Sequence, residues 1–593
     1  MLTSVDSAGQ GDRMRGAFIG VAWVLLIFLA FAGLYWLGYP ARAELGMSTE
    51  GDYMLGALQL QRDLAQCDGA CDTAATVLNP GYVMAPGLPV FSTPLFSLKE
   101  LTPQRLRLVN LAAMLLLLAA VYGLTAQLYG RRAAVLAALI TAGIPASDGL
   151  SGFYNQYLLS AAANALALLL LFKTDGLRRL RWAAPAGLAL GLALLCHRGS
   201  VLFIFAPVVL IYFALGLRRE GKMRPLLGLA LYLLPALLPA WGHMWAYYRS
   251  HLFDPVFFAQ LQAAWHDQSR SVIEFLCNSR PSDVLSGTIN YELSTGGGSD
   301  ADPWFHFRSL FDVQLGWALG LLWLPAAAVL AWVRRRDSRT WALLAAALLP
   351  PLWFGAFGTK NHFYIYQVVP LFATIIAGSA AALPRPRARL AATTYIVAAT
   401  LLCGWLPTLY AASIAGRDGL HYRFSTVWRA GYMRDFDTPG LGSACRDQLA
   451  LLKPSDLQRT AVLLVGYAEI YDERNLDSMS LTRDLLACMG MGLRDLPLAQ
   501  VELLTQSAPD GVLAEVWIYH ADERGYQAAA ALTALQQRAE PGFPAFSQGW
   551  SDRPFNLPPR PAGQALVRPT GGMNHPLKIL VYGAQEGEAF VAP

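Results

Sequence analysis

The sequence predicts a mainly α-helical, polytopic membrane protein with about eleven transmembrane helices, followed by a soluble α/β domain. Three observations predict this fold class. Of the 593 residues, 55% are hydrophobic and only 15% are charged, whereas soluble domains carry roughly a quarter charged residues. Apolar runs of about 20 residues, the length that a bilayer requires, recur throughout residues 1–415. Clusters of Lys and Arg stand at every second connection between these runs.

Each predicted span is an apolar run close to bilayer length. The first is too long for the apolar region of a cleavable signal peptide and lacks a small-residue cleavage site, so we expect it to remain as an anchor. Pro145 and Gly149 predict a turn between two spans, and a second break is expected at His197-Arg198-Gly199-Ser200. The predicted spans are residues 16–38, 106–128, 133–149, 154–173, 182–197, 200–217, 226–248, 314–333, 340–357, 363–383 and 390–414.

The basic clusters predict on which side of the membrane each connection lies. Because basic connections face the cytoplasm, the N-terminus is expected inside and the C-terminus outside. Residues 1–415 then form a membrane domain whose two long loops, 39–105 and 249–313, lie outside together with residues 416–593. This topology accounts for the formal net charge of +5, so nucleic-acid binding is not expected. We expect a multi-pass protein of the bacterial inner (cytoplasmic) membrane with a periplasmic C-terminal domain.

Residues 416–593 have the pattern of a soluble α/β domain. Short apolar runs at 461–466, 516–519 and 579–582 predict buried strands. Residues 481–489 and 526–538 predict helices. The domain contains no nucleophile motif and no phosphate loop, so structural support and a cover over an active site are both open roles.

Four segments predicted to face outside carry a resemblance to a known family. They are the acidic segment Glu50-Gly51-Asp52-Tyr53, the Pro-rich segment 81–89, the basic segment His197-Arg198 before an apolar helix, and the segment from His362 to Pro370. Together they resemble the integral-membrane GT-C glycosyltransferases, the class that contains the protein O-mannosyltransferases and the aminoarabinose transferase of lipid A. The resemblance covers roughly residues 15–415. It implies a GT-C-like membrane domain and a polyprenyl-phosphate sugar as donor.

The resemblance implies that an acid of the first outside loop is catalytic. An acceptor hydroxyl loses its proton as it attacks the sugar, and a carboxylate within hydrogen-bond reach acts as the base. Asp52 and Glu50 are the candidates; the alternative is that both acids cap a helix that begins near Tyr53. Asp148, in the second outside turn, is a candidate second acid that assists the base or a metal. It is equally a typical turn residue in Ser-Asp-Gly.

The leaving phosphate needs a cation at the same interface. Arg198 is the first candidate, because Arg binds phosphate as a fork; ordinary snorkelling at the end of a span is the alternative. No set of acids and His has clear metal-ligand spacing, and a divalent cation (Mg²⁺ or Mn²⁺) is left open. The further candidates for substrate binding are His197, Lys360, His362, Tyr364, Tyr53 and Asn155.

The expected function is therefore a glycosyltransferase that moves a sugar from a polyprenyl-phosphate donor to a lipid, glycan or protein acceptor on the outer face of the cytoplasmic membrane. Two alternatives remain. One is a polyprenyl-linked glycan ligase or oligosaccharyltransferase. The other is a transporter or flippase for lipid-linked sugars, which predicts intramembrane charges or inverted repeats that the sequence does not show.

Overall fold

The computed structural model describes part of the chain, and the chain divides into two compact units. The first unit contains residues 1–40, 108–244 and 273–429; the second contains residues 41–107, 245–272 and 430–593. The two units are described separately, and the predicted domain boundary at residue 415 stays a prediction. The described residues are 6–37, 53, 54, 56, 57, 60, 61, 64, 86–97, 103–152, 154–197, 208–214, 216–218, 223–251, 304–356, 362–406, 409, 461–467, 498–504, 514–519, 546–547, 565–569 and 576–582.

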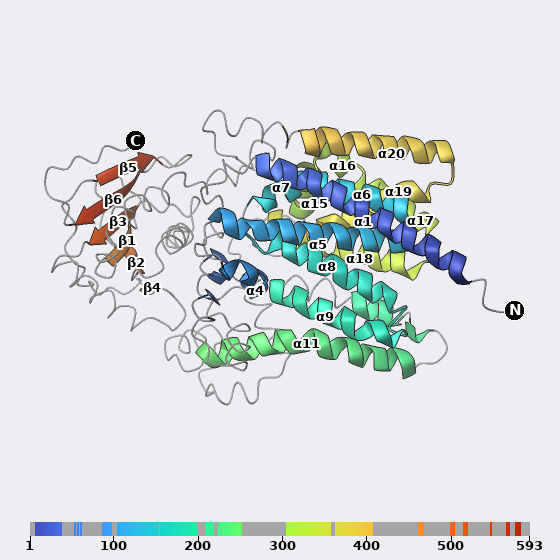
Figure 1. The fold of residues 1–593 in the computed structure, drawn as a ribbon, viewed down its shortest axis with the longest axis horizontal. Coiled ribbons are helices and arrows are strands. Elements are labelled where there is room, and N and C mark those ends of the chain that lie inside the picture. The colour runs from blue at the N-terminus through green and yellow to red at the C-terminus, as the bar shows by residue number, and fades with distance from the viewer. Residues whose placement is uncertain are drawn as a thin grey trace. The chain divides into compact units, whose positions relative to one another are not determined.

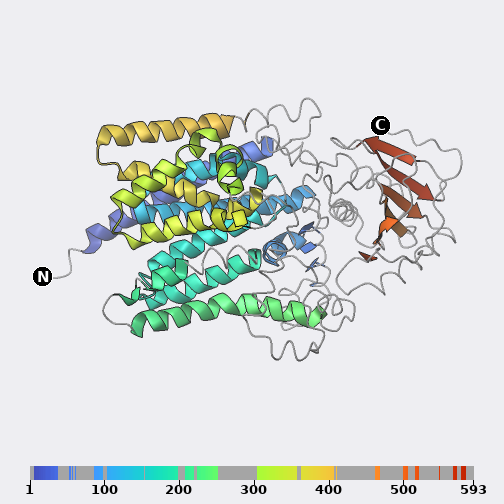
Figure 2. The same ribbon diagram turned by 180° about the vertical axis from the view of Figure 1, so that it is seen from behind.

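The first unit is a set of apolar helices whose long members lie side by side (Figures 1 and 2). Every predicted span contains helical residues. Within the described residues, four helices are long and apolar enough to cross a membrane, and one bent pair makes a fifth if it counts as one span. The predicted total of about eleven spans stays a prediction. The helices are α1 (Asp6–Leu37), α5 (Pro103–Tyr129), α6 (Arg131–Gly143), α7 (Pro145–Ser151), α8 (Tyr157–Lys173), α9 (Leu180–Cys196), α11 (Met223–His251), α15 (Phe305–Ser309), η3 (Leu310–Gln314), α16 (Trp317–Gly320), α17 (Trp323–Val333), α18 (Ser338–Ala356), η4 (His362–Val368), α19 (Val369–Ala382), α20 (Pro386–Thr400) and η5 (Leu401–Trp405).

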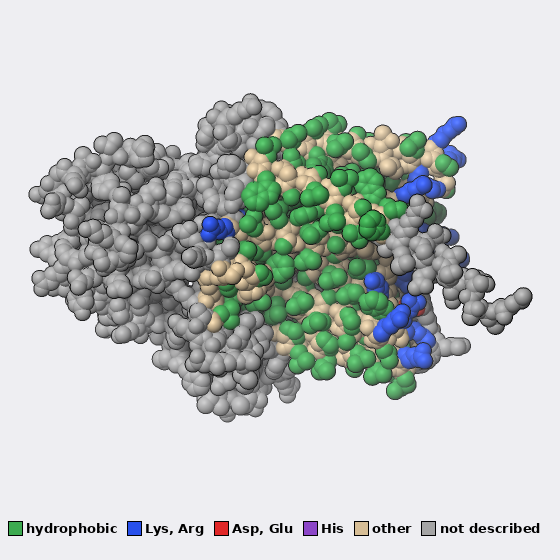
Figure 3. Space-filling view, in the orientation of Figure 1, with side chains coloured by type: hydrophobic (Ala, Val, Ile, Leu, Met, Phe, Trp, Pro, Cys, Tyr) green, Lys and Arg blue, Asp and Glu red, His purple; other side chains and the backbone are tan. Residues whose placement is uncertain are grey.

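Helix α19 forms the centre of this unit. In the segment Tyr364–Ala382, 83% of the apolar stretch is buried, against 28% for α1 and 22% for α20. Helix α19 packs against α6, α17, α18 and α20. An apolar helix that leaves most of its surface uncovered suits contact with lipid, so α1 and α20 are peripheral. Figure 3 shows the apolar side chains as a broad belt, with most Lys and Arg gathered beyond one end of it.

Helices α9 and α11 approach each other closely through two glycines. A Cβ atom on Gly187 would overlap the Tyr232 carbonyl oxygen, and a Cβ atom on Gly191 would lie 2.9 Å from the Pro235 carbonyl oxygen. Gly187 and Gly191 are four residues apart and therefore share one face of α9. Small residues at this spacing allow membrane helices to pack backbone to backbone.

The turn predicted at Pro145 and Gly149 is instead a bend of 56° between α6 and α7. Pro145 is in the first turn of α7, where its fixed φ suits a helix and its missing N–H costs nothing. Gly149 is helical, and α7 continues to Ser151 before α8 begins at Tyr157. Asp148, predicted in the second outside turn, therefore lies in a short helix and is only 5% exposed.

In the second unit, the helix predicted after Asp52 is confirmed at the positions that the structure describes. Residues 53, 54, 56, 57, 60, 61 and 64 are helical. Tyr53, Met54 and Leu60 are almost fully buried. The Gln61 Nε2 atom donates a hydrogen bond of 3.0 Å to the Phe96 carbonyl oxygen. This bond ties the helix to η2 (Thr93–Ser97), which follows α4 (Gly87–Phe91).

The same unit contains a six-stranded mixed sheet with the order β4-β2-β1-β3-β6-β5. Strand β1 pairs parallel with β2 and antiparallel with β3, and β3 pairs parallel with β6. The three predicted strands are confirmed as β1, β3 and β6, which are neighbours in the sheet. The predicted helices at 481–489 and 526–538 lie outside the described residues, so the α/β class of this domain stays a prediction. The strands are β1 (Ala461–Tyr467), β2 (Leu498–Leu504), β3 (Ala514–Tyr519), β4 (Phe546–Ser547), β5 (Ala565–Pro569) and β6 (Pro576–Tyr582).

Candidate functional site

Chain direction brings several polar segments of the first unit to one end of the helices. Helix α6 starts at Arg131 and leads to α7, and α8 runs from Tyr157 to Lys173. Helix α9 then returns from the basic residues and ends just before His197. The distal end, as we name it, comprises α7, the start of α8, the end of α9 and η4. Because α7 contacts α8 and η4 also packs against α8, these segments lie together, away from the basic clusters.

A row of five rings crosses the distal end. The His197 ring lies 5.8 Å from the Tyr157 ring and 6.4 Å from the Tyr364 ring, measured between centroids. The Phe354 ring follows at 5.8 Å from Tyr364, and the His306 ring lies 6.0 Å from Phe354. These centroid distances lie within the range of favourable aromatic pairs. The row joins α8, the end of α9, η4, α18 and α15, so His197 and Tyr364, both predicted site residues, are brought together.

Hydrogen bonds fix η4 against α8. The Ser160 hydroxyl donates to Gln367 Oε1 at 2.7 Å, and Gln367 Nε2 donates to the Tyr364 carbonyl oxygen at 3.2 Å. Ser160 and Gln367 are 207 positions apart and both are buried. Buried hydrogen-bonded side chains of this kind specify one arrangement of the helices, because separating them would leave polar groups unpaired. The position of Tyr364 is thereby defined relative to α8.

The start of α7 is fixed by a hydroxyl that replaces a missing backbone donor. In a continuous helix the Thr141 carbonyl would accept from residue 145, but Pro145 has no N–H. The Ser147 hydroxyl donates to this carbonyl instead, at 2.6 Å. Because Ser147 has one proton and uses it there, its oxygen accepts from the Tyr366 hydroxyl, which lies 2.8 Å away.

The other end of α7 is held by two buried amides. Asn110 Nδ2 donates to the Ser151 carbonyl oxygen at 3.0 Å, and Asn155 Nδ2 donates to the Leu150 carbonyl oxygen at 2.7 Å. Asn155 Oδ1 also accepts from the Tyr157 N–H at 2.9 Å. The last carbonyls of a helix have no intrahelical partner, so these bonds satisfy them. Asp148 is therefore carried by a short helix that is secured at both ends.

The structure describes only some of the predicted site residues. His197, Tyr364 and Asp148 belong to the distal end. Asn155 is also there, but it is fully buried and its amide serves the α7–α8 connection; direct substrate binding by Asn155 stays a prediction. Tyr53 is 2% exposed and belongs to the second unit. Asp52, Glu50, Arg198 and Lys360 lie outside the described residues, as does the side chain of His362, whose backbone begins η4.

Sequence reasoning missed His306, which is fully buried at the end of the ring row. It was assigned to the outside loop 249–313. The signal that could have found it is the segment Trp304-Phe305-His306-Phe307, a His among aromatic residues shortly before an apolar span, as at His362. Asn110 was also missed, although a lone amide within an apolar helix is a reason to look for a partner.

No group of three or more His, Cys, Asp or Glu side chains that could hold a metal ion occurs among the described residues. The described distal end contains the Asp148 carboxylate, the His197 imidazole and the tyrosine hydroxyls of η4, and the ring row ends at a second imidazole, that of His306 in α15. These groups can exchange protons and bind hydroxyls.

Comparison with known proteins gives one family match. Residues 84–243 match the family model of the dolichyl-phosphate-mannose-protein mannosyltransferases. Asp148, His197 and both amides that hold α7 lie inside the matched segment. The match confirms the resemblance predicted from the sequence, namely to membrane glycosyltransferases of the GT-C superfamily. No curated protein sequence matches the chain.

Solved structures give weaker likenesses. ArnT from Cupriavidus metallidurans bound to undecaprenyl phosphate is 18% identical, with a TM-score of 0.49, over 88% of this chain and 89% of that one. Its apo state is 20% identical, with a TM-score of 0.47, over 81% and 86%. The apo oligosaccharyltransferase of Archaeoglobus fulgidus is 16% identical, with a TM-score of 0.45, over 73% of this chain, which spans 58% of the length of that enzyme.

Proposed function

We propose that this protein is a glycosyltransferase that moves a sugar from a polyprenyl-phosphate donor to a lipid, glycan or protein acceptor. The observation that carries the proposal is the family match, whose segment contains Asp148 and His197. The geometry supports it, because the acid-bearing helix α7 and the ring row of His197 and Tyr364 lie at one end of the helices. A buried acid at the same end of the helices as an imidazole is typical of a site that transfers protons.

The reaction follows from the groups required. The acceptor hydroxyl attacks the anomeric carbon, the bond from that carbon to the phosphate oxygen breaks, and polyprenyl phosphate leaves with the electron pair. The acceptor proton passes to a carboxylate, for which Asp52 or Glu50 is proposed, and Asp148 is proposed to assist. Arg198 is proposed to bind the leaving phosphate, with Lys360 and His362 as further cations. His197, Tyr364, Tyr53 and Asn155 complete the proposed substrate-binding set.

We further propose that the transfer takes place on the outer face of a bacterial inner membrane. The support is the separation of charges: Lys and Arg gather at one end of the apolar belt, and basic ends face the cytoplasm (Figure 3). The distal end then faces outward. With about eleven spans before them, residues 416–593 form an extracytoplasmic domain. A Cys or tag placed after residue 416 should be labelled by an impermeant reagent in intact spheroplasts, whereas labelling only after lysis would contradict this orientation.

The activity is tested by replacing the two loop acids separately, Asp52→Asn and Glu50→Gln. Purified protein in liposomes is given a polyprenyl-phosphate sugar labelled in the sugar, and loss of label from the lipid is followed. A general base contributes about 10²–10⁴-fold, so at least one variant should slow transfer by that factor. Glu44→Gln, which removes an acid of the same loop, is the matched control and should transfer at the wild-type rate. Unchanged transfer in both Asp52→Asn and Glu50→Gln would refute the assignment of the base.

The same assay separates an enzyme from a transporter. A flippase would move the labelled lipid across the bilayer without breaking the bond between sugar and phosphate. An enzyme of the proposed type releases polyprenyl phosphate in amounts equal to the sugar transferred. Movement of intact labelled lipid, with no free polyprenyl phosphate formed, would contradict the proposed reaction.

A further inference from the structure

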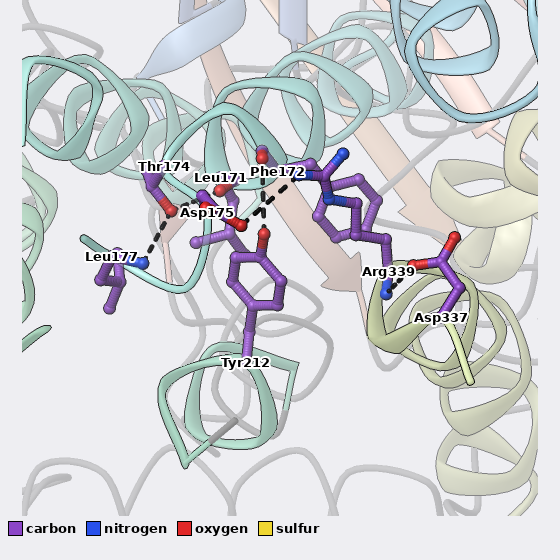
Figure 4. Close-up of polar contacts among 8 residues, drawn as sticks. All are labelled: Leu171, Phe172, Thr174, Asp175, Leu177, Tyr212, Asp337 and Arg339. Atoms are coloured by element: carbon purple, nitrogen blue, oxygen red, sulfur yellow. Dashed lines mark hydrogen bonds and ion pairs between the residues drawn. The ribbon is translucent and has the colours of Figure 1, made fainter. Parts of the chain in front are cut away.

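The basic end of the α8–α9 hairpin is built on a rigid left-handed turn. Asp175, Gly176 and Leu177 have φ values of 54°, 72° and 62°. Residues other than glycine rarely adopt such φ values, and they keep them only where the surrounding structure enforces them. Here the Thr174 hydroxyl oxygen accepts from the Leu177 N–H at 3.0 Å (Figure 4). The Thr174 carbonyl oxygen accepts from the Arg179 N–H at 2.8 Å. The side chains that leave this turn therefore start from a fixed backbone.

Two carboxylates beside the turn, those of Asp175 and Asp337, both contact Arg339. An Arg339 guanidinium nitrogen lies 3.6 Å from Asp175 Oδ1, and the Arg339 backbone N–H donates to Asp337 Oδ1 at 3.0 Å (Figure 4). The same hairpin end is joined to a neighbouring segment by the Tyr212 hydroxyl, which donates to the Phe172 carbonyl oxygen at 3.4 Å (Figure 4). The acids near the turn thus stabilise the α18 contact.

Three cations of this hairpin end pair with no acid among the described residues. Within the part of the chain that the structure describes, Lys173, Arg178 and Arg181 make no ion pair. Lys173 Nζ lies 4.6 Å from the centroid of the Trp182 ring, and Arg181 Cζ lies 5.9 Å from it. Attraction to the ring face holds both cations near one indole in spite of their mutual repulsion. Arg178 Nη1 is buried and has no hydrogen-bond partner among the described residues.

This arrangement fits a phosphate group. Arg178 lies in the connection between Lys173 and Arg181 and is partly exposed, so it adds a third cation to the same hairpin end. Arg and Lys together bind phosphate, Arg through its planar fork and Lys as a point charge. The other basic segments of the described chain have no comparable set of two cations on one ring.

The surroundings indicate that the phosphate belongs to a lipid. Trp182 is at the start of α9, next to Lys and Arg, where an indole typically marks the membrane interface. Further along α9, Leu188 and Leu192 are 48% and 49% exposed, so this helix offers an apolar face for acyl chains. Figure 3 shows that Lys and Arg gather where the apolar belt ends. Only a ligand with both a phosphate and acyl chains would use both features.

We propose that Lys173, Arg178 and Arg181, with Trp182, bind the phosphodiester headgroup of an anionic phospholipid such as phosphatidylglycerol. The lipid would join the hairpin end to the bilayer and neutralise its charge. The site is at the opposite end of the helices from the distal end, so it does not depend on the proposed transfer reaction. No covalent step is involved.

Native mass spectrometry of the full-length protein in detergent tests this proposal, with phosphatidylglycerol, phosphatidylcholine and inorganic phosphate as separate probes. Wild-type protein should bind phosphatidylglycerol more tightly than phosphatidylcholine. The double variant Lys173→Gln/Arg181→Gln should weaken phosphatidylglycerol binding about 25-fold, at about fivefold for each cation lost near a headgroup. Arg178→Gln alone should weaken it about fivefold. Inorganic phosphate should bind far more weakly than the lipid.

The matched control is Arg385→Gln/Arg387→Gln, which removes two positive charges from the connection before α20 and should leave phosphatidylglycerol binding unchanged. An equal loss in this control would mean that total charge, and not the hairpin cluster, attracts the lipid. Unchanged binding in Lys173→Gln/Arg181→Gln would also overturn the proposal. If phosphate alone bound as tightly as the lipid, the site would be one for a free anion. Retained helical circular dichroism would establish that each variant is folded. Trp182→Phe, which keeps an aromatic face, should lose less phosphatidylglycerol binding than Trp182→Leu.

Discussion

Removing the two hydroxyls at the bend between α6 and α7 should cost different amounts of stability. The Ser147 hydroxyl makes two hydrogen bonds, because it donates to the Thr141 carbonyl oxygen and accepts from Tyr366, whereas the Tyr366 hydroxyl makes one of them. Tyr366→Phe removes one hydrogen bond and leaves Ser147 still bonded to Thr141. It should lower the free energy of unfolding by about 0.6–1.7 kcal/mol, the range for side-chain hydrogen bonds within membrane proteins.

Ser147→Ala should be more costly, because two bonds are lost and the Tyr366 hydroxyl is left buried without its partner. Tyr366 is fully buried, so the unpaired hydroxyl adds its desolvation penalty. The expected loss is about 2–4 kcal/mol. Adding Tyr366→Phe to Ser147→Ala removes that unpaired hydroxyl. The double variant should therefore be no less stable than Ser147→Ala alone, and the two losses should not add.

Steric trapping in bicelles would measure the free energies of unfolding for this cycle. Ser379→Ala is the matched control, because the Ser379 hydroxyl donates only to the Ile376 carbonyl oxygen of its own helix, at 2.8 Å. Loss of this hydroxyl should change the free energy of unfolding by a few tenths of a kcal/mol. Losses that add in the double variant would refute the Tyr366–Ser147 hydrogen bond. A Tyr366→Phe loss larger than that of Ser147→Ala would refute its inferred direction.

Two further stability predictions follow from the packing. Gly187→Ala should lower the free energy of unfolding by about 1–3 kcal/mol, because the new methyl group overlaps the Tyr232 carbonyl oxygen and must push α9 from α11. The control is Gly33→Ala on α1, where a Cβ atom would have no other atom within 4 Å. It should be neutral or slightly stabilising. Equal effects of both substitutions on thermal unfolding would contradict the close packing. Asp175→Asn should lower the free energy of unfolding by at most about 1 kcal/mol, because Asp175 and Arg339 are 29% and 32% exposed and solvent screens their attraction. A larger loss in the same assay would mean that the ion pair is stronger than its exposure allows.

The sequence predicted the helices of the first unit well, because apolar length and the alternation of basic connections are local signals. It also located the interruption at Pro145 but interpreted it as a turn. The difference comes from Ser147, whose hydroxyl replaces the missing Pro145 donor and allows a second helix to start at once. Such a replacement depends on where a hydroxyl points after folding, so spacing along the chain does not predict it.

The parts of the candidate site that were missed are pairings between distant positions. Ser147 and Tyr366 are 219 positions apart, and no periodicity relates them. His306 was assigned to a loop because the apolar span begins after it, although its ring lies beside Phe354 of α18. In the sheet, β2 (Leu498–Leu504) was missed because its sequence LAQVELL mixes polar and apolar residues, whereas the central strands β1 and β6 are nearly continuous apolar runs.

The exposure of α20 has a consequence for how the protein is made. Of the four helices that pass as spans in the described residues, α20 with η5 has the lowest hydropathy and the least burial. A weakly apolar segment partitions poorly from the translocon into lipid as a single helix. Helix α20 follows α19 after a connection at Leu383–Arg385 and packs against it. We therefore expect the two to enter the bilayer together as a hairpin, so that α19 supplies the insertion energy that α20 lacks.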